Sequence, residues 1–409
     1  MKRKQPARNS GSNAKKEKIS QISYDAQWKQ IGSPIAADLK PLLILDGPGI
    51  PSSQVVYGFD MDDTIITPAS GRKFGQGSDD WVLLFPEVAD TLRELHKNGI
   101  KIAIFTNQGG IEKKKVTVPS ICKKIENIIN EIDIPIQVFI STGQSHYRKP
   151  SPCMWEYMQK NCNGGKNIDT SKSFYVGDAA GRPKGWKPGA KKDFSCSDRM
   201  FAANAKVQFA TPEEFFLKEK PASFNWNSID PNSLLKEVIA KNKRPVYASK
   251  SQEVVLLIGR PASGKSTFAE RYFVSAGYVS INRDTLQTQK KCLDVTKQSL
   301  KSGKSVVVDN TNPSKEARKN YIDAAKSAGV PVRCFHLTTN DEIASHLNMF
   351  RQTQTQGKRR RVPYVGFRVY DKGFQSPSKS EGFTEVTMLD FKPSFDSKND
   401  QDMFLQWTC

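Results

Sequence analysis

Two aspartates directly follow a short apolar run and offer the chemistry of phosphoryl transfer. Asp60 and Asp62 lie in the sequence YGFDMDDTII, residues 57–66. Side chains two residues apart on a strand point to the same side, so the carboxylates should lie together and share a divalent cation, predicted to be Mg²⁺. Asp60 would then attack phosphorus and form an aspartyl-phosphate, with Asp62 as general acid and base. An isolated acidic pair at a strand end is equally compatible with a solvated turn.

Three further segments supply the groups that this chemistry needs. Thr106, in FTNQ, offers a hydroxyl to a phosphoryl oxygen, and Lys149, in YRKPSP, offers positive charge to the transferred group. Asp178, in VGDAAGR, offers a further oxygen ligand to the metal. Asp198, in CSDRMFA, opens a predicted helix. It is either another metal carboxylate or an acid that interacts with the helix dipole, and the sequence leaves both open.

A second centre is predicted at residues 259–267, where GRPASGKST matches the phosphate-binding pattern G-x-x-x-x-G-K-[ST]. The glycines let backbone N–H groups face the β-phosphate of ATP, Lys265 reaches the β- and γ-phosphate oxygens, and Ser266 holds Mg²⁺. The predicted nucleotide-binding residues are Gly259, Ser263, Gly264, Lys265, Ser266 and Thr267.

Three residues beyond that loop are candidates to complete a kinase. Asp309 ends the run SVVVD and is predicted to hold a Mg²⁺-bound water. Asp284, in INRDTLQ, is a candidate base for an attacking hydroxyl, and it is equally a candidate cap for the following helix. Arg351 follows an amphipathic stretch, where small P-loop kinases carry a lid arginine, and His346 on the same stretch is expected to be structural.

Strands that end at one edge of a sheet would bring the first set of residues together. Between residues 55 and 216, helical patterns alternate with four apolar runs that end in polar residues, VVYGFD, KIAIFTN, IQVFIST and SFYVGD. In PEVADTLRELHKNG, Pro86 predicts a helix start and Gly99 its end. This alternation predicts a parallel sheet covered on both faces, with the ligand beyond the carboxyl ends of the strands.

A second series of strands and helices begins at EVVLLIGR, after a segment rich in Lys, Pro, Ser and Asn. We therefore predict an α/β protein with two tandem parallel-sheet domains. The predicted divisions are a basic disordered tail at 1–40, a phosphatase domain at 41–216, a linker at 217–250 and a P-loop kinase domain at 251–409. No domain-sized insertion follows Thr64 or Thr106, so the phosphatase cleft is predicted to be uncapped, which suits a large substrate.

The composition narrows the class of partner. The 409 residues carry 62 Lys+Arg against 42 Asp+Glu, a net charge of +20. Seven Lys/Arg against one Glu give residues 1–18 a net +6, which leaves +14 on the rest. A positive charge distributed in this way favours binding to a polyanion, either nucleic acid or an anionic membrane surface. No apolar run approaches the ~18 residues of a membrane-spanning helix, and no secretory signal is present. Seven scattered cysteines without a C-x-x-C pair indicate reduced thiols in an intracellular protein.

The first set of motifs resembles the haloacid dehalogenase superfamily, and both sets in this order resemble the polynucleotide kinase 3′-phosphatase family of DNA end-processing enzymes. The resemblance covers about residues 40–395 and is carried by GFDMDDTIITPASGRKF, IFTNQGGI, RKPSPCMW, VGDAAGRPKGWKPGAKKDFSCSDRMFAANA, GRPASGKSTFAERYF, INRDTLQ, VVVDNTNPSKEARKNYI and GFRVYDKGF. Asp63 departs from the superfamily pattern, which has Gly there. If that position requires a positive φ, Asp tolerates it less well than Gly.

The resemblance implies that the protein removes 3′-phosphate from DNA strand breaks and phosphorylates 5′-hydroxyl ends from ATP. It implies Asp60 as nucleophile, Asp62 as acid and base, Asp284 as kinase base and Arg351 as lid arginine. The expected cofactors are Mg²⁺ and ATP, and the expected metal residues are Asp60, Asp62, Asp178, Ser266 and Asp309. The protein is expected to be a nuclear monomer that binds DNA. The forkhead-associated module of longer family members is not expected, because only about 40 weakly patterned residues precede the phosphatase.

Three alternatives stay open from the residues alone. They are a small-molecule kinase and phosphatase fusion, an RNA end-healing enzyme, and a nucleotide-controlled DNA-binding scaffold that has lost catalysis. The basic segments 113–115, 191–192 and 358–361 are either contacts to substrate phosphates or solvated charge runs.

Overall fold

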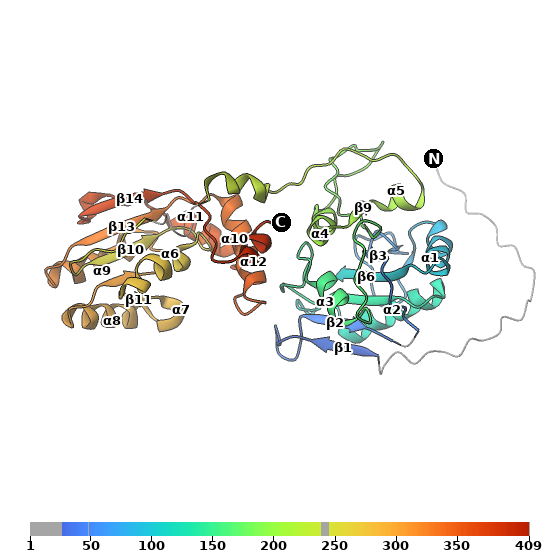
Figure 1. The fold of residues 1–409 in the computed structure, drawn as a ribbon, viewed down its shortest axis with the longest axis horizontal. Coiled ribbons are helices and arrows are strands. Elements are labelled where there is room, and N and C mark those ends of the chain that lie inside the picture. Colours follow the sequence, from blue (N-terminus) through green and yellow to red (C-terminus); the bar gives the residue numbers. More distant parts are fainter. Residues whose placement is uncertain (1–26, 48, 239–244, 409) are drawn as a thin grey trace, which may run out of the picture.

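The computed structural model describes residues 27–47, 49–238 and 245–408, and the predicted basic tail lies outside these ranges as far as residue 26. Two α/β domains follow one another along the chain, and the segment between them contains a short 3₁₀ helix, Pro231–Glu237 (Figure 1). No helix in the described ranges is long and apolar enough to cross a membrane. The predicted fold class, two tandem α/β domains, is confirmed.

The first domain is built on a seven-stranded sheet with the order β1-β2-β7-β6-β3-β8-β9. Its strands are β1 (Trp28–Ile31), β2 (Leu42–Leu45), β3 (Val56–Phe59), β6 (Lys101–Asn107), β7 (Gln137–Ser141), β8 (Phe174–Val176) and β9 (Gln208–Ala210). The five strands from β7 to β9 pair in parallel, as predicted. β1 and β2 pair antiparallel, so the sheet is mixed and the prediction of a wholly parallel sheet is wrong at this edge.

The first strand also shows that the predicted tail boundary at residue 40 is wrong. Trp28 packs against the core of the first domain, and its indole Nε1 donates to Glu126 at 2.9 Å. The strand has only four residues, and its two central residues are exposed, so its own sequence gives almost no strand pattern. Residues 28–31 form a strand because they pair with the buried strand β2, not because of a strand pattern in their own sequence.

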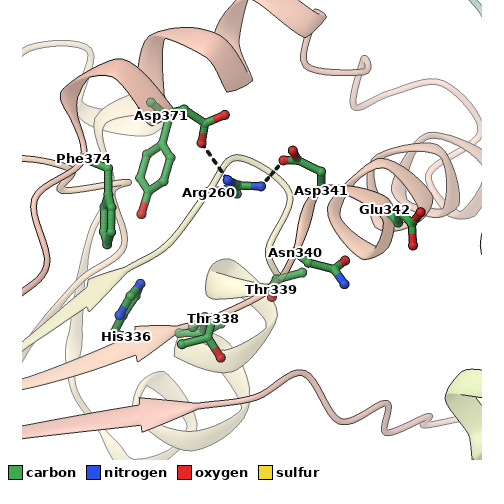
Figure 2. A pocket seen from close by; sticks show the side chains of 11 residues that line it. Arg260, His336, Thr338, Thr339, Asn340, Asp341, Glu342, Asp371 and Phe374 are labelled. Carbon is green, nitrogen blue, oxygen red and sulfur yellow. Dashed lines mark hydrogen bonds and ion pairs between the residues drawn. The ribbon is translucent and has the colours of Figure 1, made fainter.

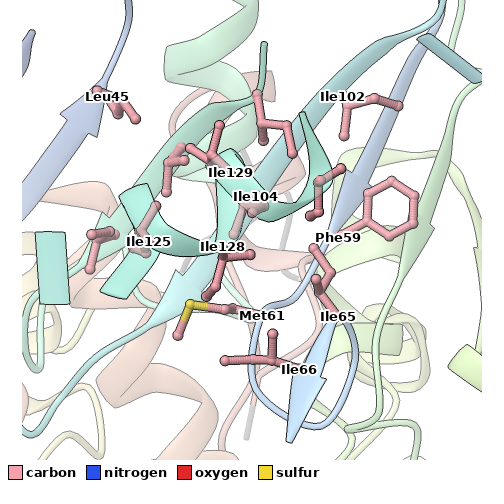
Figure 3. Packing of buried hydrophobic residues seen from close by; sticks show 14 of the residues in the cluster. Leu45, Phe59, Met61, Ile65, Ile66, Ile102, Ile104, Ile125, Ile128 and Ile129 are labelled. Carbon is pink, nitrogen blue, oxygen red and sulfur yellow. The ribbon is translucent and has the colours of Figure 1, made fainter. Parts of the chain in front are cut away.

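Helices cover both faces of this sheet. α1 (Glu87–Lys97) and α2 (Val118–Ile132) share one core cluster, whereas α3 (Cys153–Asn161) and α4 (Ser197–Ala205) share another. The isoleucines of α2 recur three or four residues apart and meet Phe59, Met61 and Ile104 in the first cluster (Figure 3). Burial of each such side chain is worth about 1.5–3 kcal/mol, so this face fixes the helix on the sheet. As predicted, α1 begins after Pro86 and ends before Gly99.

Small elements complete the first domain. A hairpin of β4 (Ile66–Thr67) and β5 (Val82–Leu83) follows the aspartate segment, and α5 (Pro212–Phe216) closes the domain. Thr211 caps α5 in a reciprocal arrangement with Glu214, which defines the helix start.

The second domain has a five-stranded, wholly parallel sheet with the order β11-β12-β10-β13-β14. Its strands are β10 (Val254–Ile258), β11 (Val279–Ile281), β12 (Val306–Val308), β13 (Val332–Leu337) and β14 (Glu385–Leu389). Its helices are α6 (Lys265–Tyr272), α7 (Arg283–Leu286), α8 (Gln289–Lys301), α9 (Lys315–Ser327), α10 (Asp341–Gln354), α11 (Tyr364–Gly373) and α12 (Lys398–Phe404). The four strands predicted from 253 onward are present, and β14 is an additional edge strand.

Candidate active sites

The carboxyl edge of the first sheet gathers three aspartates from distant parts of the chain. Asp60 follows β3, Asp178 follows β8, and Asp198 lies in the first turn of α4. One carboxylate oxygen of each residue lies within 4.8 Å of the others. Asp198 is buried, and its Oδ2 accepts from the N–H of Ala179 at 3.0 Å, so it belongs to the cluster and is not merely an acid at a helix start.

Lys149 lies at the centre of this cluster. Its Nζ is 2.8 Å from Asp60 Oδ1 and 2.7 Å from Asp198 Oδ1, and it donates to the Tyr175 hydroxyl at 2.8 Å. Asn107, at the end of β6, accepts from the Lys149 N–H at 3.0 Å and thereby fixes the backbone. Although burial opposes the charged form, the carboxylates of Asp198 and Asp60 raise the pKa of Lys149, so the ammonium stays charged.

The charges in this cluster do not balance without a further cation. Burial raises the pKa of Asp60 to about 7, against the opposing effect of Lys149. Burial, with the nearby Asp198 and Asp60, raises the pKa of Asp178 well above its usual value. When all three carboxylates are ionised, one ammonium leaves net negative charge in a buried place, which is why these pKa values are raised. An oxygen-only donor set of this charge suits a hard divalent cation such as Mg²⁺. The residues therefore fit the predicted metal, with Asp198 added to the ligands.

The structure does not place the Asp62 carboxylate in this cluster. β3 ends at Phe59, so Asp62 lies in the following turn, where the two-residue alternation of a strand no longer holds. Its side chain is half exposed and accepts from Gln108 Nε2 at 2.8 Å and from Lys124 Nζ at 3.3 Å. The Asp62 carboxylate is therefore not among the three that lie together, and its role as a metal ligand stays a prediction. Because this carboxylate is half exposed, it is accessible for the predicted role in proton transfer.

Gln108 and Lys124 were not among the predicted site residues. Gln108 Nε2 also donates to Thr106 Oγ1 at 2.9 Å, which links Asp62 to the buried threonine at the end of β6. Gln108 lies inside the quoted motif FTNQ, so a signal existed in the sequence. Lys124 lies on α2 and reaches the site only through the packing of that helix, so no local signal marked it. Asp63 stands where the superfamily has Gly, which raised the question whether this position requires a positive φ. In the structure Asp63 has φ 54°, so it does adopt a positive value.

The phosphate loop of the second domain is closed around its lysine. Lys265 is buried, and its Nζ donates to the carbonyl oxygens of Gly259 at 2.9 Å and Arg260 at 2.6 Å and to Ser263 Oγ at 3.3 Å. Gly264 has φ 92° and is the N-cap of α6, a conformation that favours glycine. Burial lowers the pKa of Lys265 to about 8, with Asp309 opposing the shift.

A cavity of about 350 Å³ beside this loop brings the predicted kinase residues together. Those among its lining residues are Lys265, Ser266, Asp284, Asp309 and Arg351. Asn282 is the N-cap of α7 and also donates to Asp309 Oδ2 at 2.8 Å. Because Asn282 caps the helix, the Asp284 carboxylate is not used as the cap. The loop residue Thr267 lies on α6, one residue beyond Ser266.

A second cavity of about 660 Å³ adjoins the phosphate loop at Arg260. Figure 2 shows Arg260 between Asp341 and Asp371, with which it forms ion pairs. Tyr370 and Phe374 stack on each other at the wall of this cavity, with ring centroids 5.4 Å apart. The sequence did not indicate this cavity, because its residues come from the phosphate loop, from β13 and the segment after it, and from α10 and α11.

Comparison with known proteins identifies the family. Residues 55–216 match the family described as polynucleotide kinase 3 phosphatase, and residues 254–377 match an AAA domain family. The bifunctional polynucleotide phosphatase/kinase of Schizosaccharomyces pombe is 39% identical over 336 residues, which cover 82% of this chain and 79% of that protein.

Two relatives are similar over a smaller part of this chain. A polynucleotide 3′-phosphatase of Arabidopsis thaliana is 37% identical over 183 residues, 41% of this chain and 25% of that protein. A polynucleotide 3′-phosphatase of Saccharomyces cerevisiae is 29% identical over 218 residues, 39% of this chain and 87% of that protein. Since both domains are matched and the Schizosaccharomyces pombe protein aligns over most of its length, this chain belongs to the family of bifunctional polynucleotide phosphatase/kinases.

Proposed function

We propose that the protein repairs DNA strand breaks by hydrolysing 3′-phosphates in its first domain and phosphorylating 5′-hydroxyls in its second. The observation that carries the phosphatase half is the buried cluster of Lys149 with Asp60, Asp178 and Asp198. The cavity at the phosphate loop supports the kinase half. Similarity to proteins named polynucleotide phosphatase/kinase supports the substrate class.

The phosphatase reaction follows from the positions of four side chains. Asp60 attacks phosphorus and forms an aspartyl-phosphate, while Asp62 protonates the departing 3′-oxygen. Asp62 then takes a proton from water, which attacks the phosphorus, releases inorganic phosphate and restores Asp60. Thr106 and Lys149 donate to the phosphoryl oxygens. Mg²⁺, held by Asp60, Asp178 and Asp198, would neutralise the carboxylates and the incoming phosphate.

The kinase reaction is a transfer of the γ-phosphoryl group of ATP to a 5′-hydroxyl. Asp284 accepts the hydroxyl proton, the oxygen attacks the γ-phosphorus, and ADP leaves. Lys265 and Arg351 stabilise the charge on the transferred group. Ser266 and Asp309 would hold Mg²⁺, which would neutralise negative charge on the phosphates of ATP. The cavity lined by Arg260, Tyr370 and Phe374 adjoins the phosphate loop and has two aromatic rings in its wall, so it is our candidate for the adenine site.

Two exposed aromatic residues near the Asp62 side of the phosphatase site support a nucleic-acid substrate. Phe74 is 75% exposed and Phe194 is 83% exposed. Lys73 Nζ lies 5.4 Å from the centroid of the first ring and 5.3 Å from that of the second. The neighbouring Gly75 lies against Lys124, which pairs with Asp62. Exposed rings beside a lysine suit the stacking of unpaired bases and contact with the strand phosphates.

DNA as the polymer and the nucleus as the location rest on the sequence resemblance and on the net charge of +20. A basic N-terminal segment is typical of nuclear or nucleic-acid-binding proteins. RNA end healing is the competing possibility, and a comparison of turnover on DNA with turnover on matched RNA separates the two.

A nicked duplex with a 3′-phosphate and a 5′-hydroxyl tests the function directly. Asp60→Asn should lower 3′-dephosphorylation by about 10³-fold or more and leave the kinase active, and Lys265→Ala should do the reverse. Equal turnover of matched RNA would move the proposal to RNA ends. Turnover of small phosphate esters and small alcohols but not of the duplex would contradict it. Binding of a polymer should also weaken steeply between about 50 and 200 mM salt.

A further inference from the structure

The segment that carries Lys149 lies between β7 and α3 and has no regular secondary structure of its own. We call residues 143–150 the Lys149 loop. Within the first domain, Glu112 accepts from the Gln144 N–H at 2.7 Å, and Asn107 accepts from the Lys149 N–H at 3.0 Å. These contacts tie Gln144 and Lys149 to the rest of the first domain.

The second domain contacts the beginning of this loop. Gln352 of α10 is 1% exposed, and its Nε2 donates to the Gln144 carbonyl oxygen at 3.1 Å. Its Oε1 accepts from Arg361 Nε at 2.6 Å, so both halves of the amide are in use. Just beyond α10, a Cβ on Gly357 would lie 2.7 Å from His146 Nδ1, so the imidazole packs directly on bare backbone. Figure 1 shows α10 and α12 on the side of the second domain that faces the first.

The C-terminal residues reach the other end of the loop through Asn204 of α4, in the first domain. Trp407 donates its N–H to Asn204 Oδ1 at 2.7 Å, and its carbonyl oxygen accepts from Asn204 Nδ2 at 2.9 Å. The same Asn204 Nδ2 donates to the Pro150 carbonyl oxygen at 2.8 Å. The Trp407 indole stacks on Trp226, with centroids 4.1 Å apart and planes 11° apart. Asn204 therefore joins the residue after Lys149 to the last residues of the second domain.

We propose that the kinase domain braces the Lys149 loop directly through Gln352 at its beginning and indirectly, through Trp407 and Asn204 of the first domain, at its end. Gln352 and Asn204 would then be positioning residues for the phosphatase reaction. Lys149 must keep its Nζ within 3 Å of two carboxylates, 2.8 Å from Asp60 and 2.7 Å from Asp198. A misplacement of a catalytic group by about 1 Å can lower the rate by about 10²-fold. The phosphatase rate therefore depends on contacts that the kinase domain supplies, even though the two sites use separate catalytic residues. The kinetic part of this inference rests on the proposed phosphatase activity.

Gln352→Glu tests the first contact. The carboxylate still accepts from Arg361 but cannot donate to the Gln144 carbonyl oxygen, which it repels. With a trinucleotide 3′-phosphate, the phosphatase kcat should fall about 3- to 30-fold while KM changes less than about twofold. Hydrogen exchange of peptides that span residues 143–150 should become at least about threefold faster. The control is Gln356→Glu, at an exposed position directly before Gly357. It makes the same charge change and should alter neither kcat nor the exchange of the loop peptides.

Asn204→Asp tests the second contact independently. It keeps the acceptor for the Trp407 N–H and loses the donor to the Pro150 and Trp407 carbonyl oxygens, so it should change loop exchange and kcat in the same direction. Wild-type loop exchange and kcat in both variants, with melting temperatures that show folded protein, would overturn the brace. Faster loop exchange in a protein whose wild type does not dephosphorylate the trinucleotide would uphold the brace and reject the proposed phosphatase function.

Discussion

At the residue scale, Tyr175 helps to fix the position of the Lys149 ammonium beside the carboxylates. The tyrosine is fully buried on β8, accepts from Lys149 Nζ at 2.8 Å and donates to the Phe105 carbonyl oxygen at 3.2 Å. Burial raises the pKa of its hydroxyl well above the ordinary value, so the group stays neutral and keeps its proton. The ammonium is thereby held by one neutral oxygen in addition to two carboxylates.

Tyr175→Phe should therefore weaken the phosphatase and cost some stability. Loss of the hydroxyl leaves Lys149 with one partner fewer, so we expect kcat on a 3′-phosphorylated oligonucleotide to fall about tenfold. Loss of a buried hydrogen bond should lower the free energy of unfolding by about 1–2 kcal/mol, measured by urea denaturation. The same change at Tyr272 in the kinase domain is the control. An unchanged kcat would show that the two carboxylates alone fix the lysine.

At the element scale, α10 does more than carry Arg351. Asn348, one turn earlier on this helix, donates to the Val362 carbonyl oxygen at 2.9 Å and accepts from the Val362 N–H at 2.9 Å. Its Oδ1 also accepts from Arg351 Nη2 at 3.1 Å. Val362 and Arg351 both line the kinase cavity, so a single buried amide fixes the helix, the lid arginine and the segment that follows.

Asn348→Leu should impair the kinase selectively. The substitution removes three hydrogen bonds around Arg351 and leaves the backbone of Val362 unpaired, which should loosen the lid. We expect kinase kcat/KM to fall about 10- to 100-fold, with the larger change in KM if the lid orders the substrates before transfer. Phosphatase kcat should stay within about twofold of the wild type. Ser345→Ala, an exposed position on the same helix, is the control, and equal loss of both activities would contradict this assignment.

At the scale of the whole molecule, the C-terminal end of the chain lies against both domains. Trp407 binds Asn204 of the first domain, while Thr408 Oγ1 lies 2.9 Å from His346 Nδ1 on α10. The His346 ring is buried and packs edge-on against Phe404, as expected for a structural histidine. Burial lowers its pKa to about 4, so the imidazole is neutral in the folded protein.

This buried histidine should make the folded protein sensitive to acid. An unfolded histidine takes up a proton near pH 6.5 and the folded one only near pH 4, so stability is complete above pH 6.5 and declines as the pH falls towards 4. The decline from this group is at most about 3 kcal/mol. His346→Gln should flatten the dependence of the unfolding free energy on pH between 4.5 and 7, measured by urea denaturation. An unchanged slope would assign the acid sensitivity to other groups.

The sequence by itself determined the two kinds of chemistry and the order of the two domains. The residues of the phosphate loop are contiguous in the sequence, so its glycines, lysine and serine indicate a nucleotide-binding site without help from any other segment. The alternation of strands and helices predicted that Asp60, Thr106 and Asp178 would meet, because parallel strands end at one edge. These inferences depend on local pattern and on one general rule of sheet topology, and both can be read along the chain.

Only the tertiary structure decided which side chains share a site when their positions depend on packing. It placed Asp198 with Asp60 and Asp178, left the Asp62 carboxylate outside that cluster, and brought Lys124 to Asp62 and Tyr175 to Lys149. The strand rule failed for Asp62 because β3 ends at Phe59, and no sequence pattern fixes the last residue of a strand that closely. The contacts of Gln352 and Asn204 join residues about two hundred positions apart, and such contacts arise from the docking of two folded domains.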